Sequence, residues 1–194
     1  MKKIIKDQQG FTMIELIVSI SIIVALTIMF VANYHNNNQR TDLIMSSQNL
    51  VSNIHLAQNN ALGLVKYNSI VPAGGWGVSL DATTNSYTVF ADLQKPGTAG
   101  YMKYDSSTEG IVSDGARLVH LPAGIVISNI AIPGNSSLTS ANVTFLPPDP
   151  ETNIYNPATG ATSTDLTIQL KATGDNSIRT IKVNFLGLAE ALQP

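Results

Sequence analysis

The sequence contains no cysteine, and this absence excludes disulfide bonds, thiolate metal sites and cysteine nucleophiles. Charged residues are also scarce: they make up 12% of the 194 residues, whereas hydrophobic residues make up 44%. Such a balance is typical of a folded chain rather than a disordered one. The many Asn, Ser, Thr and Gly residues favour an extracytoplasmic surface. The length suffices for one domain and one accessory element.

Positive charge is sparse beyond the amino terminus. After residue 33 the chain has eight Lys or Arg residues against eleven Asp or Glu residues, a net charge of −3. This balance argues against nucleic acid as a partner, because nucleic-acid-binding domains carry a basic patch. One small basic group near the carboxy terminus, Lys171, Arg179 and Lys182, has two interpretations. It is either a solvated sheet face or a set of contacts to DNA phosphates.

Motifs that carry enzymatic chemistry are missing. There is no G-x-x-x-x-G-K-[ST] phosphate loop, no G-x-S-x-G and no H-E-x-x-H. His120 lies in an apolar run and is interpreted as a core or edge residue. Asp149 and Glu151 flank a proline without the spacing of a calcium-binding loop. We therefore predict no enzymatic activity, no catalytic residue, no metal and no cofactor.

The most prominent feature that is present is a long apolar run over Phe11–Ala32. Its 22 residues suffice to cross a hydrocarbon core of about 30 Å as a helix. Three lysines precede it, at positions 2, 3 and 6. Because positive charge stays on the cytoplasmic side, the sequence predicts a single-pass membrane segment with a cytoplasmic amino terminus and an external globular part.

Glu15 interrupts this apolar run, although a charged side chain within a membrane helix costs about 2.5–3.5 kcal/mol on insertion scales. A cleaved signal peptide with a processing site near Phe30–Asn33 is one interpretation, but its apolar region would be shorter. A plain membrane anchor explains the length and leaves Glu15 without a role. The third interpretation starts from the glycine at position 10.

The sequence GFTMIEL at residues 10–16 closely resembles the processing motif of type IV pilins and type II secretion pseudopilins. The resemblance implies that a prepilin peptidase cleaves between Gly10 and Phe11 and methylates the new amino terminus at Phe11. The apolar segment then stays on the mature chain, with Glu15 as its fifth residue. It also implies three partners: other pilin or pseudopilin subunits, the prepilin peptidase and an inner-membrane assembly platform.

Two roles for Glu15 follow, and both stay open at this stage. Thr12 and Glu15 have the spacing of a capping box, in which each residue bonds the backbone N–H of the other. The family resemblance implies a second role in assembly, in which the carboxylate meets the amino group at Phe11 of a neighbouring subunit. Leaving such a charge unpaired in a low-dielectric surround is costly.

The apolar run continues into an amphipathic helix. From Leu43 to Val65 apolar residues recur at three- and four-residue steps, with Asp42, Ser46 and Asn53 on the opposite face. Neither Gly nor Pro occurs from residue 11 to residue 62. The pattern therefore predicts one nearly continuous helix from about Thr12 to about Val65.

After residue 63 the pattern changes to period two with turn signals, which predicts an antiparallel sheet. The expected strands are Trp76–Leu80, Tyr87–Phe90, Leu118–Leu121, Gly124–Ile132, Val143–Phe145, Leu166–Lys171 and Ile181–Phe185. A long helix against such a sheet is an α+β architecture, and it is the pilin fold that the resemblance implies. The expected organisation is a leader peptide (1–10), a transmembrane and assembly segment (11–33), an amphipathic helix (34–66) and a β-rich globular pilin domain (67–194).

Short segments of the globular part resemble the minor pseudopilin H (GspH) and FimT-like minor pilin group. They include GWGV at residues 75–78, VTFLP at 143–147 and RTIKVNFLG at 179–187. That group often ends its last strand with a Gly-Arg pair, and here the basic residue is missing. The resemblance implies a structural minor pilin or pseudopilin, processed in the bacterial inner membrane and assembled into a type IV pilus or a type II secretion pseudopilus. The alternative is a FimT-like minor pilin that binds DNA for natural transformation.

Overall fold

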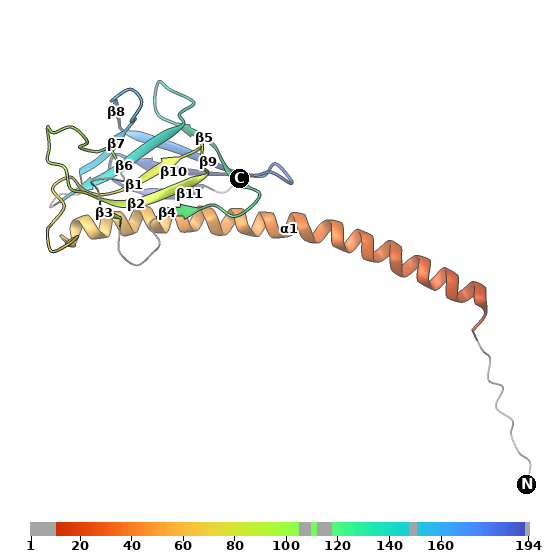
Figure 1. The fold of residues 1–194 in the computed structure, drawn as a ribbon. Coiled ribbons are helices and arrows are strands. Elements are labelled where there is room, and N and C mark those ends of the chain that lie inside the picture. Colours follow the sequence, from red (N-terminus) through yellow and green to blue (C-terminus); the bar gives the residue numbers. More distant parts are fainter. Residues whose placement is uncertain (1–10, 105–109, 112–117, 148–150, 193–194) are drawn as a thin grey trace, which may run out of the picture. The chain divides into compact units, whose positions relative to one another are not determined.

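The computed structural model describes residues 11–104, 110–111, 118–147 and 151–192, with side chains except those of 32–37 and 110–111. The chain divides into two compact units, Met1–Asn38 and Gln39–Pro194. In the described ranges, one helix is followed by eleven strands (Figure 1). This is the α+β fold that the sequence predicts.

Helix α1 runs over Met13–Leu62. It ends three residues before the predicted boundary, in a Schellman motif centred on Leu64. The amide of Val65 donates to the carbonyl of Asn60 at 2.9 Å, and the amide of Leu64 donates to the carbonyl of Ala61 at 3.1 Å. Leu64 adopts a φ of +50°, where helix ends commonly place glycine. The glycine of this sequence lies one residue earlier.

The strands form two antiparallel sheets. The first has seven strands in the order β3-β2-β1-β6-β7-β8, with β4 also paired to β2. Its strands are β1 (Gly75–Asp81), β2 (Ser86–Asp92), β3 (Gly110–Ile111), β4 (Leu118–His120), β6 (Ser140–Leu146), β7 (Glu151–Tyr155) and β8 (Thr162–Ser163). The second has the order β11-β10-β9-β5. Its strands are β5 (Ile125–Ala131), β9 (Asp165–Ala172), β10 (Ile178–Asn184) and β11 (Ala189–Leu192).

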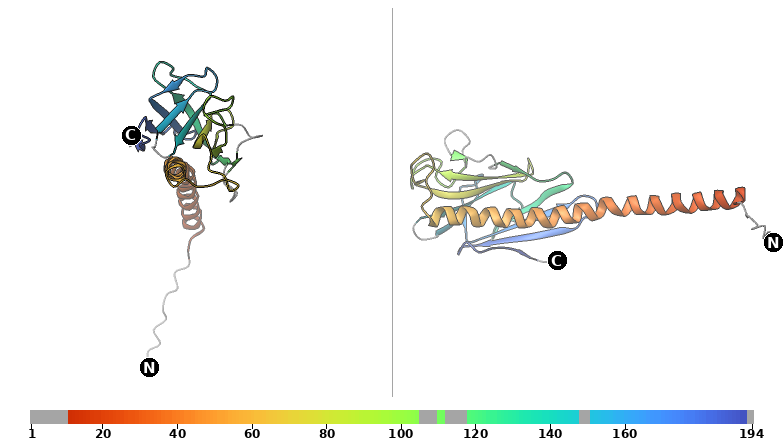
Figure 2. Two further views of the ribbon diagram at one scale, coloured as in Figure 1. Left: turned by 90° about the vertical axis from the view of Figure 1, so that its left-hand side faces the viewer. Right: turned by 90° about the horizontal axis from the view of Figure 1, so that it is seen from below.

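A single apolar core joins the carboxy-terminal half of α1 to both sheets. Leu50 and Ile54 of the helix are fully buried in one cluster with Val78 of β1, Phe145 of β6 and Ile168 of β9. In Figure 2 (right), this half of the helix runs alongside the strands of the globular unit, with strands of both sheets beside it. The period-two pattern of the carboxy-terminal hairpin therefore does place an apolar face on the core.

The polar face assigned to the helix from the sequence is wrong at two positions. Ser46 is 5% exposed, and Asn53 is half-buried. The side-chain amide of Asn53 donates to the hydroxyl of Tyr87 on β2 at 3.0 Å. The helix contacts two sheets, so its buried face is wider than a single stripe, and small or amide side chains occupy the margins of that face.

The last predicted strand is also too long. Phe185 was expected to continue the buried alternation of Ile181 and Val183, but β10 ends at Asn184 and Phe185 is 57% exposed. The side-chain oxygen of Asn184 accepts from the amides of Leu186 and Leu188, each at 3.0 Å. These bonds close a turn and redirect the chain into β11.

Two glycines with nearly equal φ angles provide a test of packing in the first sheet. Gly75 has a φ of +85°, and a Cβ atom there would collide with the carbonyl oxygen of Phe145 on β6. Gly134 has a φ of +84°, and a Cβ atom there would have no neighbour within 4 Å. Alanine at either position must adopt a positive φ, and at Gly75 it also meets the neighbouring strand.

We expect Gly134→Ala to lower the free energy of unfolding by about 1–2 kcal/mol, the cost of a left-handed residue with a side chain. Gly75→Ala should cost at least about 2 kcal/mol more, because the added methyl forces β1 and β6 apart. Urea unfolding followed by circular dichroism in detergent micelles measures both. Equal losses for the two variants would show that the close approach of β1 to β6 is absent.

Candidate functional site

The amino-terminal motif begins at the first described residues. Phe11 is 80% exposed and precedes the helix, and Gly10 lies outside the described residues. Thr12 is the N-cap residue. Its hydroxyl accepts from the amide of Glu15 at 3.3 Å, and its carbonyl accepts from the amide of Leu16 at 3.2 Å. The Thr12 half of the predicted capping box is thereby confirmed.

The reciprocal half of the capping box is not formed in the structure. The side chain of Glu15 is exposed and makes no hydrogen bond or ion pair with any described residue. Capping therefore uses the backbone N–H of Glu15 and leaves its carboxylate available. The local structure accounts for Thr12 at this position, but it does not account for the choice of an acid three residues later.

The helix that follows has the length and composition of a membrane span over Met13–Val31, with a mean hydropathy of 2.7 and none of its side chains buried. Three hydroxyl side chains occur in it, and each donates to the carbonyl four residues earlier. The bonds are Ser19 to Glu15 at 2.8 Å, Ser21 to Ile17 at 2.8 Å and Thr27 to Ile23 at 2.7 Å. Such back-bonding satisfies a hydroxyl where no water is present.

Among the described side chains of this span, the carboxylate of Glu15 is thus the polar group that still lacks a partner. Every other polar side chain of Met13–Val31 is satisfied by the helix itself. Sequence reasoning identified Glu15 as costly. It did not identify the three hydroxyl-to-carbonyl bonds, which leave Glu15 as the polar side chain of the described span without a partner.

Residues 5–31 match the family model of the prokaryotic N-terminal methylation motif. The chain carries this methylation motif. The match includes the Gly10–Phe11 junction and Glu15, and it ends at Val31, where the candidate span also ends. It supports a processed, membrane-anchored subunit of the type IV pilin kind. No curated protein and no solved structure matches the chain.

The three basic residues singled out in the sequence are not brought together. Lys171 lies opposite Ile178, and Lys182 lies opposite Thr167, on the face of the second sheet that points away from the core. Arg179 lies opposite the buried Leu170 and therefore belongs to the other face. Lys171 and Lys182 are themselves four residues apart along the ladder, about 13 Å.

An acidic residue also faces Lys182, because Glu190 of β11 lies directly opposite it in the ladder. Opposite charges at facing positions attract and reduce the local positive potential. A continuous basic patch, as phosphate binding requires, is therefore not formed by these three residues. DNA contact by them stays a prediction without structural support.

The other titratable residues named from the sequence lie apart. His120 is exposed on the edge strand β4, Glu151 begins β7, and Asp149 lies outside the described residues. The described residues contain no group of three or more His, Asp or Glu side chains arranged to hold a metal ion.

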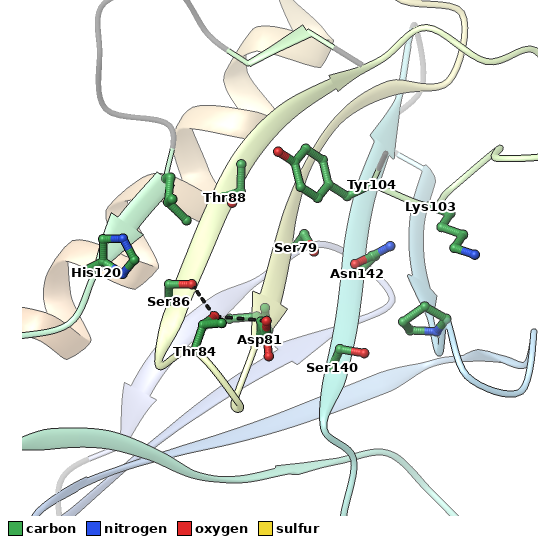
Figure 3. A pocket seen from close by; sticks show the side chains of 13 residues that line it. Ser79, Asp81, Thr84, Ser86, Thr88, Lys103, Tyr104, His120, Ser140 and Asn142 are labelled. Atoms are coloured by element: carbon green, nitrogen blue, oxygen red, sulfur yellow. Dashed lines mark hydrogen bonds between the residues drawn. The ribbon is translucent and has the colours of Figure 1, made fainter. Parts of the chain in front are cut away.

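A second candidate site lies on the face of the seven-stranded sheet that points away from the core. Here a cavity of about 430 Å³, called the polar groove below, is lined by residues of β1, β2, β4 and β6 (Figure 3). Its floor consists of two cross-strand rows, which the strand registers define. One row is Thr88, Ser79 and Asn142, and the other is Ser86, Asp81 and Ser140. Sequence reasoning missed this site because its residues come from separate strands.

The segment after β2 forms one wall of the polar groove and is held by Asp92. The Asp92 carboxylate accepts from the amides of Gln94 and Met102, each at 2.8 Å. The side-chain amide of Asn142 donates to the carbonyl of Met102 at 3.1 Å. The ring of Tyr104 then packs on Phe90, with the ring centroids 5.4 Å apart. Asp92 therefore positions the aromatic ring of the groove.

The two aspartates of this face differ in their environments. Burial raises the pKa of Asp92 above 3.8, despite the two amide bonds that favour its charged form. For Asp81, burial acts in the same direction, but hydrogen bonds from Thr83 and Thr84 outweigh it and lower the pKa below 3.8. Asp92 therefore holds its proton to a higher pH than Asp81 does.

We expect the carboxyl ¹³C resonance of Asp92 to titrate at a higher pH than that of Asp81 in the folded protein. Because the folded pKa of Asp92 is raised, its contribution to the free energy of unfolding falls as pH rises through that pKa. Asp81 behaves oppositely, and its contribution is lost as pH falls through its folded pKa. NMR titration with Asp92→Asn for assignment checks the order; a lower midpoint for Asp92 would contradict it.

Proposed function

We propose that the protein is a structural minor pilin or pseudopilin. It is inserted in the bacterial inner membrane with its amino terminus in the cytoplasm and its globular unit outside. A prepilin peptidase cleaves it between Gly10 and Phe11 and methylates Phe11. The mature chain is then assembled through its amino-terminal helix into a type IV pilus or a type II secretion pseudopilus.

The observation that carries this proposal is the isolated carboxylate of Glu15. Within a methylation motif, it is the polar side chain of the described span that the helix leaves without a partner. An unpaired charge at membrane depth is costly, so a partner supplied on assembly lowers its free energy. The cationic amino group that cleavage creates at Phe11 is such a partner when it comes from a neighbouring subunit.

The surface of the same helix suits assembly with other apolar helices. Large apolar side chains from Met13 to Val31 are each between 51% and 82% exposed, and they occur on all sides of the helix. In a membrane they contact lipid, and in a fibre they contact the helices of other subunits. Because apolar contact alone does not fix the axial register of such helices, we assign that role to the pairing of Glu15 with the amino terminus at Phe11.

The two kinds of fibre, type IV pilus and type II secretion pseudopilus, come from the resemblance of the amino-terminal motif to both kinds of subunit. We therefore retain both in the proposal. DNA capture by a FimT-like minor pilin is the alternative function. No observation favours it, because Arg179 lies on the opposite sheet face from Lys171 and Lys182.

Co-expression with a prepilin peptidase tests the processing step. We expect mass spectrometry to find a mature chain that starts at Phe11 and carries one additional methyl group. Gly10→Val should leave the leader in place, while the neighbouring Gln9→Ala serves as the matched control and should be processed. An intact leader on the wild-type chain, or cleavage after Ala32, would show that the methylation motif is not used.

A pair of substitutions separates the two roles of Glu15. Glu15→Gln keeps a residue that suits a capping box but removes the charge, and Thr12→Val keeps the charge but removes the cap. We expect both variants to be processed. Glu15→Gln should reduce incorporation into fibres at least tenfold in a competition with wild type. Thr12→Val should weaken helix initiation by about 1 kcal/mol and reduce incorporation less.

The measurement is the ratio of tagged variant to untagged wild type in sheared fibres, normalised to the ratio in membranes. Equal incorporation of Glu15→Gln and wild type would exclude the intersubunit ion pair. A larger defect in Thr12→Val than in Glu15→Gln would assign the motif to helix capping.

A further inference from the structure

The floor of the polar groove is a regular lattice of hydrogen-bonding side chains. Ser79 of β1 lies directly between Thr88 of β2 and Asn142 of β6. The second row repeats this arrangement two residues later in β1 and two residues earlier in the antiparallel strands β2 and β6. Neighbouring strands are about 4.8 Å apart, and the rows are about 7 Å apart. The floor is therefore a regular array, and Figure 3 shows its side chains on adjacent strands.

Several groups of this lattice have unused hydrogen-bonding capacity. The hydroxyls of Ser79, Thr88 and Ser140 make no hydrogen bond with any described residue. Asn142 uses its amide nitrogen on Met102, which leaves its side-chain oxygen available. Thr88 is 5% exposed and Asn142 is 2% exposed. The groove therefore offers neutral donors and acceptors to a ligand.

The charge of the groove is low, which restricts the class of ligand. The carboxylate of Asp81 is occupied by Thr83 and Thr84, with contacts of 2.6–2.9 Å. Lys103 and His120 contribute isolated basic groups from opposite sides (Figure 3). An anionic ligand such as a phosphate would need several cations at one point, and a metal ion would need free carboxylates. Neither requirement is met by the described lining.

The walls add apolar surface to this neutral lattice. Tyr104 provides an aromatic ring beside Phe90, and Leu118 and Pro157 provide aliphatic contacts. The volume of about 430 Å³ lies within the range of about 300–1,000 Å³ for small-ligand sites. Sugars match this combination, because each ring has hydroxyls at its edge and C–H groups on its faces, and the C–H faces pack on aromatic rings.

We propose that the polar groove binds a neutral oligosaccharide. The hydroxyls of Ser79, Thr88 and Ser140 and the side-chain oxygen of Asn142 form hydrogen bonds to sugar hydroxyls, and the ring of Tyr104 packs on a sugar face. This site lies within residues 39–194 and does not depend on how the amino-terminal motif is processed or assembled.

The test uses the full-length protein in a polyoxyethylene detergent, which carries no sugar headgroup and does not compete. An array of neutral and anionic oligosaccharides is screened, and the strongest neutral glycan is then titrated by calorimetry. We expect binding to at least one neutral oligosaccharide. The double variant Ser79→Ala/Ser140→Ala should weaken it about tenfold or more, because two hydrogen bonds are lost.

These substitutions remove hydroxyls that have no protein partner among the described residues, so the fold should be retained, and the melting temperature checks this. Thr88→Val, which preserves shape, should weaken binding as well. Thr167→Ala, on the outward face of the second sheet, is the matched control and should leave binding unchanged. Three outcomes would each overturn the proposal: no binding to any neutral glycan on the array, binding to anionic glycans only, or equal affinity of wild type and the double variant for the neutral glycan.

Discussion

The contact of one helix with two sheets holds the globular unit together. Leu50 and Ile54 of α1 are fully buried against strands of both sheets, and truncation of such residues typically costs about 2–5 kcal/mol. Polar bonds fix the helix on each side. Asn53 donates to Tyr87 of the first sheet, and Gln39 accepts from the amide of Gly174 beside the second. The two sheets thus share one core through the helix.

The two parts of α1 have different distributions of apolar side chains, and the difference reflects what each part contacts. From Met13 to Val31 the apolar residues occur on all sides, as expected for a segment surrounded by lipid or other helices. From Leu43 to Ala61 the buried residues form one face against protein. Helix α1 has neither Gly nor Pro, so it resists local melting. One continuous helix can therefore contact lipid or other helices in its first part and the globular unit in its second.

The sequence predicted the helix, its apolar span and seven of the eleven described strands, because each of these depends on a local pattern. It did not predict that the strands divide between two sheets, since pairing of β5 with β9 joins residues about forty apart in the chain. Strand β11 was missed because its sequence, Ala-Glu-Ala-Leu, consists of good helix formers. Short strands such as β8 contain too few residues for any periodicity.

The candidate sites also differed in whether a local sequence pattern could predict them. Thr12 and Glu15 are three residues apart, so their spacing predicted the N-cap bond that the structure contains. The polar groove joins residues 79, 88 and 142 through strand register, and no local pattern indicates it. Lys171, Arg179 and Lys182 looked like a cluster because they are close in sequence, but alternation along β10 separates Arg179 from Lys182.

Trp76 is an intrinsic fluorescence probe of this protein. It is the single tryptophan of the sequence, it is 2% exposed on β1, and its indole N–H donates to the carbonyl of Val65 at 3.0 Å, just beyond the end of α1. Any movement that separates the helix end from β1 breaks this bond and admits water to the indole. The emission wavelength of the unmodified protein therefore follows the attachment of the helix to its sheet, without a label and in the presence of other subunits that lack tryptophan.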